Sequence, residues 1–169
     1  ACIIGLMCGC GLRRAEVASV TWANYAMRDD RAVLVDMVGK GNKIRTIPVP
    51  GWVARDLDAL RRANKREGKL DELRIIPVCA WTIWAHLNHW VAEVAKLPGH
   101  EHVAGATPHD MRRTLAKLMR KAGVSLEQIS ATLGHASLTT TRIYLDDHIE
   151  LRKGKAGVDA IDIDSDESA

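Results

Sequence analysis

The sequence predicts a mainly α-helical domain with one small three-stranded antiparallel sheet. Most of the chain repeats apolar residues at the spacing of a helix, as Val53, Leu57 and Leu60 do. Residues 21–49 instead contain short runs in which apolar and polar side chains alternate, which is typical of strands. A chain of 169 residues buries roughly 70% of the surface that it exposes when unfolded, which is enough for one substantial core.

The predicted sheet follows two helical segments. An apolar segment runs to Gly11, and a short helix is expected over residues 13–20. The sequence Gly-Lys-Gly-Asn at residues 39–42 joins two alternating runs and predicts a β-hairpin. The three predicted strands cover residues 21–25, 32–38 and 43–49.

Further helices are expected after the sheet, over residues 51–66 and 81–97. The inward residues of the second are predicted to be Trp84, Leu87, Val91 and either Val94 or Ala95. After a loop over residues 98–107, Pro108 starts another helix, which Gly123 ends. Ser125 and Gln128 form a capping-box pattern for the next helix, which Gly134 closes.

The composition argues against a membrane protein and a zinc protein. The apolar opening, residues 1–12, is far shorter than the ~20 residues of a membrane span, and it does not resemble a signal peptide. The four cysteines have no paired zinc spacing, and three of them lie in this apolar segment. We therefore expect a cytoplasmic protein with reduced cysteines.

The charge is distributed unevenly between the body of the chain and its end. The net charge is +3, but residues 1–153 carry 23 basic and 16 acidic side chains, a net +7, while residues 154–169 are acidic. Two basic clusters could contact phosphates or could be solvated helix faces: Arg61, Arg62, Lys65, Arg66 and Lys69, and Arg112, Arg113, Lys117, Arg120 and Lys121.

Residues 107–147 place polar and titratable side chains among apolar neighbours. His109 and Arg112 are one helical turn apart, His135 lies in a Leu-Gly-His corner, and Tyr144 follows nine residues later. Guanidinium groups suit a phosphodiester, whose negative charge grows in the transition state. Imidazoles can donate to a phosphate oxygen or carry the proton of the nucleophile. These residue types indicate attack on a phosphodiester, with Tyr144 as the nucleophile.

A second arginine and a lysine for the same site come from earlier in the chain. Arg13 lies at the start of the first short helix, where Glu16 can pair with it across one turn. Lys40 lies at the predicted hairpin tip, from which it could reach the site as an acid. Lys43 competes for this role, but Lys40 has flanking glycines that let the tip bend towards the site.

These motifs resemble the tyrosine recombinase (phage integrase) family in their order and approximate spacing. The resemblance covers the chain from its first helix to about residue 150, and it implies the catalytic fold of DNA breaking-rejoining enzymes. At Arg113 many relatives carry histidine, which is a small departure. The matching motifs are Gly11-Leu12-Arg13 with Glu16, Gly39-Lys40-Gly41, His109 with Arg112, Leu133-Gly134-His135, and Tyr144.

The resemblance implies a role for each of these residues in site-specific DNA recombination. Arg13 and Arg112 would clamp the scissile phosphate, with Glu16 in support, and Lys40 would protonate the leaving 5′ oxygen. His109 and His135 would assist the transfer, and Tyr144 would form a 3′-phosphotyrosyl link. Three further residues are expected to contact DNA: Lys43, Arg113 and Lys117. The family chemistry implies no cofactor, no metal and no ATP.

The resemblance also implies the partners and the domain plan. A double-stranded DNA recombination site would be bound by a homotetramer on two sites, and the chain without DNA would be a monomer or weak oligomer, with no membrane involved. Residues 1–153 would be the catalytic domain, without an amino-terminal DNA-clamping domain, so we expect a fragment. Residues 154–169 would be an acidic tail, either disordered or docked on a neighbouring subunit as in relatives.

The sequence also suggests two rival functions and one rival site. Residues 113–145 taken alone resemble a helix-turn-helix regulator without catalysis, but this leaves Arg13, Lys40 and His109 unexplained. A type IB topoisomerase shares the chemistry, but the short length and the Leu-Gly-His corner favour a recombinase. A metal cluster is not expected, because no acidic or cysteine partner is fixed near four histidines, His86, His89, His100 and His102.

Overall fold

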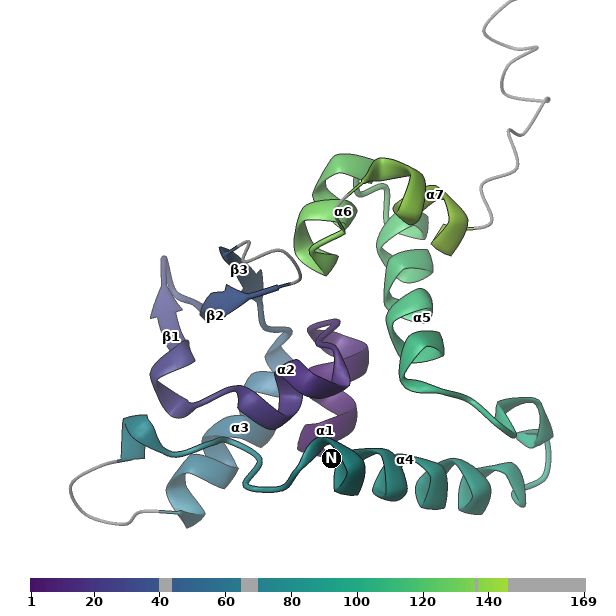
Figure 1. Ribbon diagram of the computed structural model, residues 1–169, viewed down its shortest axis with the longest axis horizontal. Helices are drawn as coiled ribbons and strands as arrows, with labels where there is room; N and C mark the ends of the chain where they lie inside the picture. Colours follow the sequence, from purple (N-terminus) through teal and green to yellow (C-terminus); the bar gives the residue numbers. More distant parts are fainter. Residues whose placement is uncertain (40–43, 65–69, 136, 146–169) are drawn as a thin grey trace, which may run out of the picture.

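The computed structural model describes residues 1–39, 44–64, 70–135 and 137–145, apart from the side chains of Ile143 and Tyr144. The sheet and α1 to α4 form one part of the molecule, and α5 to α7 stand beside it (Figure 1). The two parts meet where α6 contacts β3 and where α5 contacts the opening helical segment. The predicted class, mainly α with one three-stranded antiparallel sheet, is confirmed.

The opening segment is helical and runs through the core. The short helix α1 (Cys2–Ile4) continues directly into a π-helical stretch, η1 (Gly5–Gly9), whose Leu6 and Met7 are fully buried. The chain then turns at Gly11, which has a φ of +65°, and enters α2 (Arg14–Ser19). The turn at Gly11 places this segment against the later helices.

The sheet is a meander of three strands. The strands β1 (Tyr25–Arg28), β2 (Arg31–Val38) and β3 (Ile44–Pro48) pair antiparallel in the order β1-β2-β3. Leu34 at its centre pairs with Tyr25 and Ile47, and all three are buried. The register shifts between Leu34 and Met37, where Asp36 has a φ of 54°. The predicted hairpin is therefore confirmed, although its tip, residues 40–43, lies outside the described residues.

The first predicted strand, residues 21–25, is wrong for residues 22–24: β1 begins at Tyr25, and Thr21 makes only an isolated bridge with Arg74. Residues Trp22–Asn24 form a 3₁₀ turn, η2, because the Asn24 side chain accepts a hydrogen bond from the Thr21 backbone N–H at 3.0 Å. This local bond competes with strand pairing. Trp22 still points into the core and is 2% exposed, and Tyr25 is buried three residues later, a spacing that fits the turn and not the alternation of a strand.

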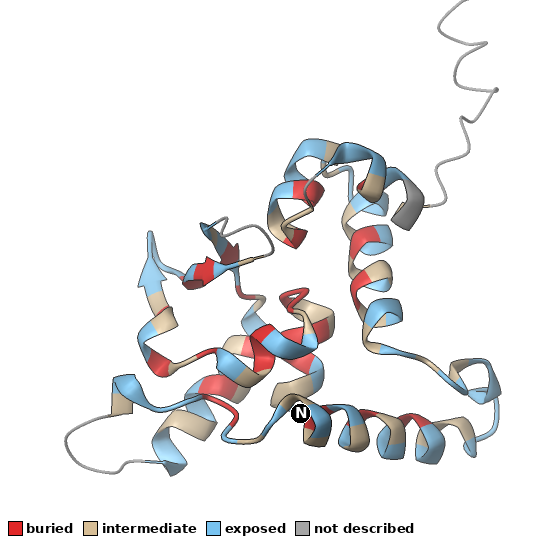
Figure 2. Cartoon of the chain, in the orientation of Figure 1, coloured by how far each residue is buried: buried red, intermediate tan, exposed pale blue. Residues whose placement is uncertain are grey.

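Two helices close the lower part of the core. Helix α3 (Gly51–Ala63) buries Val53 and Leu57, and α4 (Ala80–Ala95) follows a 3₁₀ turn, η3 (Leu70–Glu72). Figure 2 shows buried positions gathered where η1, α2, α3 and α4 meet. Residues 65 and 66, the end of the helix predicted over residues 51–66, lie outside the described residues, as do residues 67–69.

The inward face of α4 differs from the prediction by one residue. Leu87 and Val91 are buried as expected, but the stripe begins at Ile83, and Trp84 is 40% exposed. Ile83, Leu87 and Val91 are four residues apart and share a face, whereas Trp84 lies about 100° further around the helix. Trp84 was expected to face inward because its side chain is large and apolar, but its position on the helix places it outside the buried face.

The last three helices form a second, smaller core. A 3₁₀ turn, η4 (Glu101–Val103), lies in the connection to α5 (Pro108–Lys121), which is followed by α6 (Leu126–Leu133) and α7 (Leu138–Leu145). Ala116, Ile129 and Leu133 are fully buried between them. Ser125 Oγ accepts from Gln128 N at 3.2 Å, and Gly134 ends α6 in the left-handed conformation, as predicted.

The close approach at Gly11 gives a test of how the two parts of the molecule pack. A Cβ at this position would lie 2.7 Å from Leu133 Cδ2, and Leu133 has no exposed surface into which to move. We expect Gly11→Ala to lower the free energy of unfolding by about 3 kcal/mol, from backbone strain and overpacking together. Urea unfolding monitored by circular dichroism measures this change.

The matched control is Gly123→Ala. Gly123 also has a positive φ, +83°, but no atom lies within 4 Å of a Cβ built there. It should lose only the strain, about 1 kcal/mol. Equal losses in the two variants would show that contact with Leu133 contributes nothing.

Candidate active site

The candidate site is centred on the C-terminal end of α6. The last carbonyl groups of a helix lack partners within the helix, and the helix dipole makes this end negative. Three consecutive carbonyls here each accept a hydrogen bond from a different arginine. Arg45 Nε donates to Thr132 O (3.2 Å), Arg112 Nη2 to Leu133 O (2.7 Å) and Arg13 Nη2 to Gly134 O (3.0 Å).

Arg112 is the most deeply buried of these arginines. It lies on α5 and is 2% exposed. Besides Leu133 O, its guanidinium donates through Nη1 to Gly11 O. A buried charge is costly unless it is hydrogen-bonded, so these carbonyls fix where the guanidinium can lie. Arg112 thereby joins the turn after η1 to the end of α6.

Glu16 on α2 orients the other two arginines. Its Oε1 accepts from Arg13 Nη1 at 2.9 Å, and its Oε2 accepts from the Arg13 backbone N–H at 2.7 Å and from Arg45 Nη2 at 2.9 Å. The predicted pairing of Arg13 with Glu16 is therefore present. Arg13 and Arg45 share this one carboxylate, so their two positive charges exceed its single negative charge.

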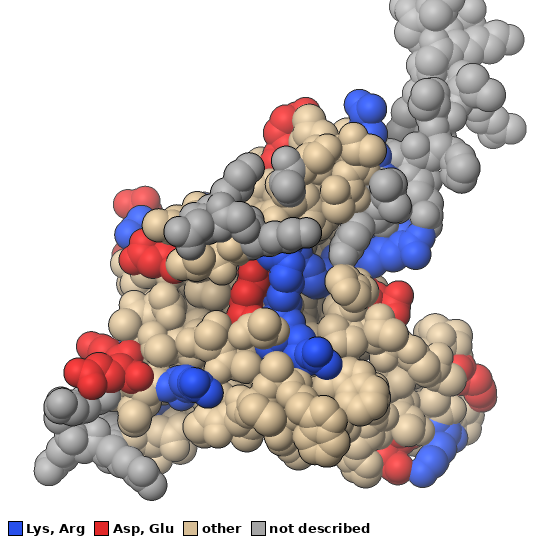
Figure 3. All heavy atoms as spheres, in the orientation of Figure 1, with Lys and Arg blue, Asp and Glu red and all other residues tan. Residues whose placement is uncertain are grey.

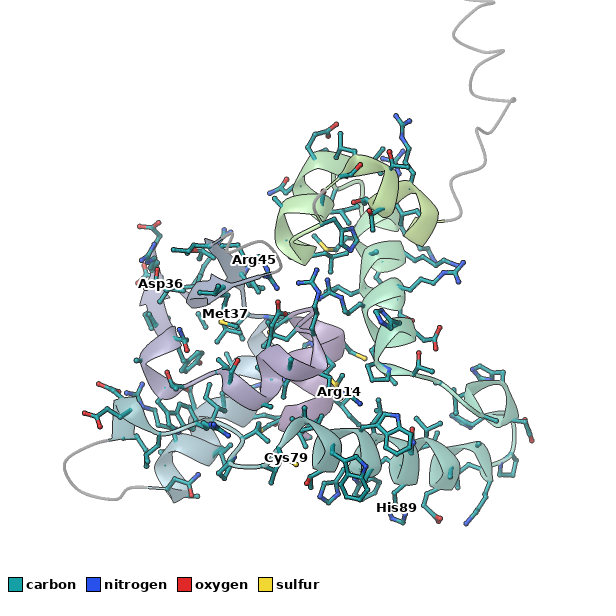
Figure 4. All side chains as sticks on the ribbon, in the orientation of Figure 1. Arg14, Asp36, Met37, Arg45, Cys79 and His89 are labelled. Carbon is teal, nitrogen blue, oxygen red and sulfur yellow. The ribbon has the colours of Figure 1, made fainter. Side chains whose placement is uncertain are left out.

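Arg45 was not among the residues predicted from the sequence. It lies on β3, facing α6 (Figure 4), and its side chain is 8% exposed. One signal could have found it. Arg45 and the fully buried Ile47 are two residues apart, and such residues share one face of a strand. An arginine on the core face of a strand requires a buried partner, and Glu16 is that partner.

Gly134 allows Arg45 to approach the corner after α6. Its φ is +63°, and a Cβ there would lie 2.9 Å from Arg45 Nη1 and 3.0 Å from Arg45 Cζ. The Leu-Gly-His corner therefore needs glycine for two reasons, the left-handed conformation and the space taken by the guanidinium.

His135 follows this corner and is half-buried. Its backbone N–H donates to Ser130 O at 3.0 Å, and its Nδ1 lies 2.9 Å from Thr141 Oγ1 on α7. Burial, followed by the positive charges of Arg112, Arg13 and Arg45, lowers the pKa of His135 to about 4. His135 is therefore neutral at neutral pH.

His109 lies in the first turn of α5, one turn before Arg112, and is exposed. The turn is fixed by its cap: Asp110 Oδ2 accepts from the Thr107 hydroxyl at 2.6 Å and from its N–H at 2.9 Å. These two bonds from Thr107, the hydroxyl first, lower the pKa of Asp110. The cap and Pro108 position His109 at the end of the helix that holds Arg112.

Two predicted residues lie outside the described residues, and a third has no described side chain. Lys40 and Lys43 fall between β2 and β3, and Tyr144 is on α7. The second tyrosine of the chain, Tyr25, is buried, and its hydroxyl donates to Asp58 Oδ1 at 3.1 Å. Burial and the nearby Asp58 carboxylate raise the pKa of Tyr25 to about 12, so it is poorly suited to act as a nucleophile.

Basic side chains gather on one face of the molecule. Figure 3 shows Lys and Arg gathered at the centre of this face, between the sheet and α5, with acidic side chains beside them. Arg113 is half-buried and Lys117 is exposed, both on α5. Of the two predicted basic clusters, the one on α5 adjoins the three arginines.

The four described histidines outside the site lie on α4 and around η4. His86 and His89 are exposed on α4, and the rings of His100 and His102 are stacked at 6.4 Å. In the described ranges no three His, Cys, Asp or Glu residues are grouped so as to hold a metal ion. No helix among the described residues is long and apolar enough to span a membrane.

Comparison with known proteins identifies the family. A model of the phage integrase family matches residues 1–150, and the chain therefore belongs to this family. The tyrosine recombinase XerC of Corynebacterium efficiens is 30% identical over 143 residues, covering 84% of this chain and 44% of XerC. XerA of Thermococcus kodakarensis is 30% identical over 159 residues, covering 90% and 53%. The chain thus spans about half the length of these relatives.

Solved structures share the fold at low sequence identity. The XerH recombinase bound to its difH substrate superposes with a TM-score of 0.72 at 19% identity, covering 92% of this chain and 45% of XerH. The Tn1549 transposon integrase in complex with transposon right end DNA gives 0.69 at 19% identity, covering 94% and 57%. The predicted tyrosine recombinase fold is confirmed.

The bonds of Arg45 give a stability prediction. We expect Arg45→Met to lower the free energy of unfolding by about 3 kcal/mol, because it removes a pair whose side chains are 8% and 9% exposed and leaves Glu16 with one guanidinium. Arg45→Lys keeps the charge but not the planar fork, so an intermediate loss is expected. Urea unfolding at constant pH measures both.

Lys96→Met is the control, since Lys96 pairs with Glu93 through side chains that are 69% and 47% exposed. This variant should unfold like the wild type, because exposed ion pairs contribute little. If Arg45→Met and Lys96→Met behaved alike, Arg45 would not be part of a stabilising network.

Proposed function

We propose that this chain is the catalytic part of a tyrosine site-specific recombinase, which cleaves and rejoins DNA through a 3′-phosphotyrosyl intermediate. One observation carries the proposal: three guanidinium groups converge on the end of α6, beside a neutral His135. A net positive, hydrogen-bonding site of this kind suits a phosphodiester, whose charge grows in the transition state.

Membership of the family supports the same activity. The relatives XerC and XerA are tyrosine recombinases, and the XerH and Tn1549 integrase structures were determined with DNA. The order of Arg13, His109, Arg112, His135 and Tyr144 along this chain fits the roles that the family chemistry requires.

The proposed reaction exchanges one phosphoester bond for another. The Tyr144 oxygen attacks the phosphorus and gives its proton to an imidazole of the site or to water, and the bond from phosphorus to the 5′ oxygen breaks. Lys40 gives a proton to that oxygen. Arg13 and Arg112 stabilise the nonbridging oxygens, and His109 and His135 assist the transfer. A 5′-hydroxyl from a second DNA strand reverses the steps, so neither ATP nor a metal is required.

The partner in this proposal is double-stranded DNA. Lys43, Arg113 and Lys117 would contact its phosphates, as basic side chains do in sequence-independent binding. The active assembly would be a homotetramer on two recombination sites, formed from monomers or weak oligomers in the cytoplasm. Residues 1–153 would act as the catalytic domain, and the tail over residues 154–169 would dock on a neighbour or stay disordered.

The covalent intermediate gives the most direct test. A recombination site is first selected from a random DNA pool by binding, and the protein is then incubated with a nicked duplex of that site. We expect a denaturation-resistant protein–DNA adduct that is lost in Tyr144→Phe and kept in Tyr25→Phe. The difference is expected because the Tyr25 hydroxyl is buried and bonded to Asp58. Gel electrophoresis in detergent detects the adduct.

The outcomes separate the rival functions. A helix-turn-helix regulator would bind the selected DNA and give no adduct with any variant. A type IB topoisomerase would give the adduct and would relax supercoiled DNA without joining two sites. An adduct that persisted in Tyr144→Phe would overturn the assignment of the nucleophile.

A second prediction separates the proton donor from the phosphate clamp. Lys40→Ala should cleave normal DNA slowly and recover when sulfur replaces the bridging 5′ oxygen, because a thiolate leaves without a proton. Arg13→Ala should cleave both substrates more slowly than the wild type, on the order of 10²- to 10³-fold. Sulfur at the bridging position does not rescue this variant, because the charge on the nonbridging phosphate oxygens remains. Single-turnover cleavage measures the rates.

Lys43→Ala is the matched control on the same hairpin and should change little on either substrate. Sulfur rescue of Lys43→Ala in place of Lys40→Ala would transfer the acid role to Lys43. Equal slowing of Lys40→Ala on both substrates would reduce Lys40 to a phosphate contact.

A further inference from the structure

We propose that Thr141 is a positioning residue that fixes the tautomer of His135, so that the imidazole carries its proton on Nε2. The juxtaposition is the 2.9 Å contact between Thr141 Oγ1 on α7 and His135 Nδ1 at the corner after α6. The role in catalysis rests on the proposed function, but the tautomer itself does not.

The direction of this hydrogen bond follows from the burial of Thr141. Its side chain has no exposed surface, and within the described ranges its hydroxyl has one hydrogen-bonding partner, His135 Nδ1. A threonine in a helix commonly donates to the carbonyl four residues earlier, but no such bond is made here to Ser137. If Nδ1 carried the proton, the Thr141 hydroxyl hydrogen would be buried without an acceptor, at a cost of about 1–3 kcal/mol.

Thr141 therefore donates, and Nδ1 accepts. A neutral imidazole that accepts at one nitrogen carries its proton at the other. His135 is neutral at neutral pH because it is half-buried and faces Arg112 from α5, Arg13 from the start of α2 and Arg45 from β3. The ring thus presents a single N–H donor, at Nε2.

This assignment chooses between two roles that the sequence left open for His135. A neutral ring protonated at Nε2 is a hydrogen-bond donor to a nonbridging phosphate oxygen, and it cannot accept the proton of the nucleophile at that nitrogen. Thr141 would thus act on the reaction only through His135, by holding the proton where it can be donated.

The test observes the tautomer directly. The chain is labelled with ¹⁵N-histidine, the His135 signals are assigned by their loss in His135→Gln, and ¹⁵N–¹H NMR at pH 7 identifies the protonated nitrogen. We expect Nε2–H in the wild type and in Thr141→Ser, which keeps the hydroxyl. Thr141→Val should shift the ring towards the Nδ1–H form. Thr139→Val, at an exposed position of the same helix, is the control and should retain Nε2–H.

The kinetic consequence is measured on the selected DNA site. Thr141→Val should lower the single-turnover cleavage rate about 10-fold, roughly the factor of one neutral hydrogen bond, with unchanged DNA affinity and with rescue by Thr141→Ser. A wild-type ring protonated on Nδ1, or a Thr141→Val ring that keeps Nε2–H, overturns the proposal. The expected tautomers without any covalent adduct in the wild type would support the tautomer assignment and overturn the proposed function.

Discussion

The site depends on the end of one short helix. The carbonyls of Thr132, Leu133 and Gly134 close α6 with no helical partners, and each takes a hydrogen bond from a different guanidinium. The helix end gains acceptors for its negative dipole, and the arginines gain the hydrogen bonds that a buried cation requires. Because the arginines come from three distant parts of the chain, the positive site exists only when all of these parts are assembled.

Glu16 makes this assembly specific. Without a carboxylate, three guanidinium groups near one helix end would repel one another. Glu16 accepts hydrogen bonds from both Arg13 and Arg45, and its negative charge reduces the repulsion between these two guanidinium groups. At His135, burial first and then the remaining excess of positive charge lower the pKa of the imidazole. The same charges that would bind a phosphate thus help burial to keep the neighbouring histidine neutral.

Much of this arrangement could be predicted from local sequence signals. Apolar periodicity, caps and glycines located the helices and the hairpin, and a spacing of three residues predicted the pairing of Arg13 with Glu16. The failures lie where distant parts of the chain decide the outcome. Arg45 was not predicted as a site residue because its partners are 29 and 87 residues away in the sequence. Thr141 was not predicted because only its contact with His135 in the folded structure connects it to the site. At residues 22–24 a side-chain hydrogen bond favoured a 3₁₀ turn over a strand, and on α4 the helix geometry left the large apolar side chain of Trp84 40% exposed.

The nature of the acceptors has a consequence for how such a site can diverge. Four of the groups that hold the arginines are main-chain carbonyls, at Gly11, Thr132, Leu133 and Gly134. A carbonyl oxygen survives every substitution of its own residue, provided that the backbone keeps its path. Apart from the glycines, whose conformations are needed, mutations can therefore accumulate at these positions without removing an acceptor. Such a site can persist through extensive sequence drift while a small number of charged side chains is retained.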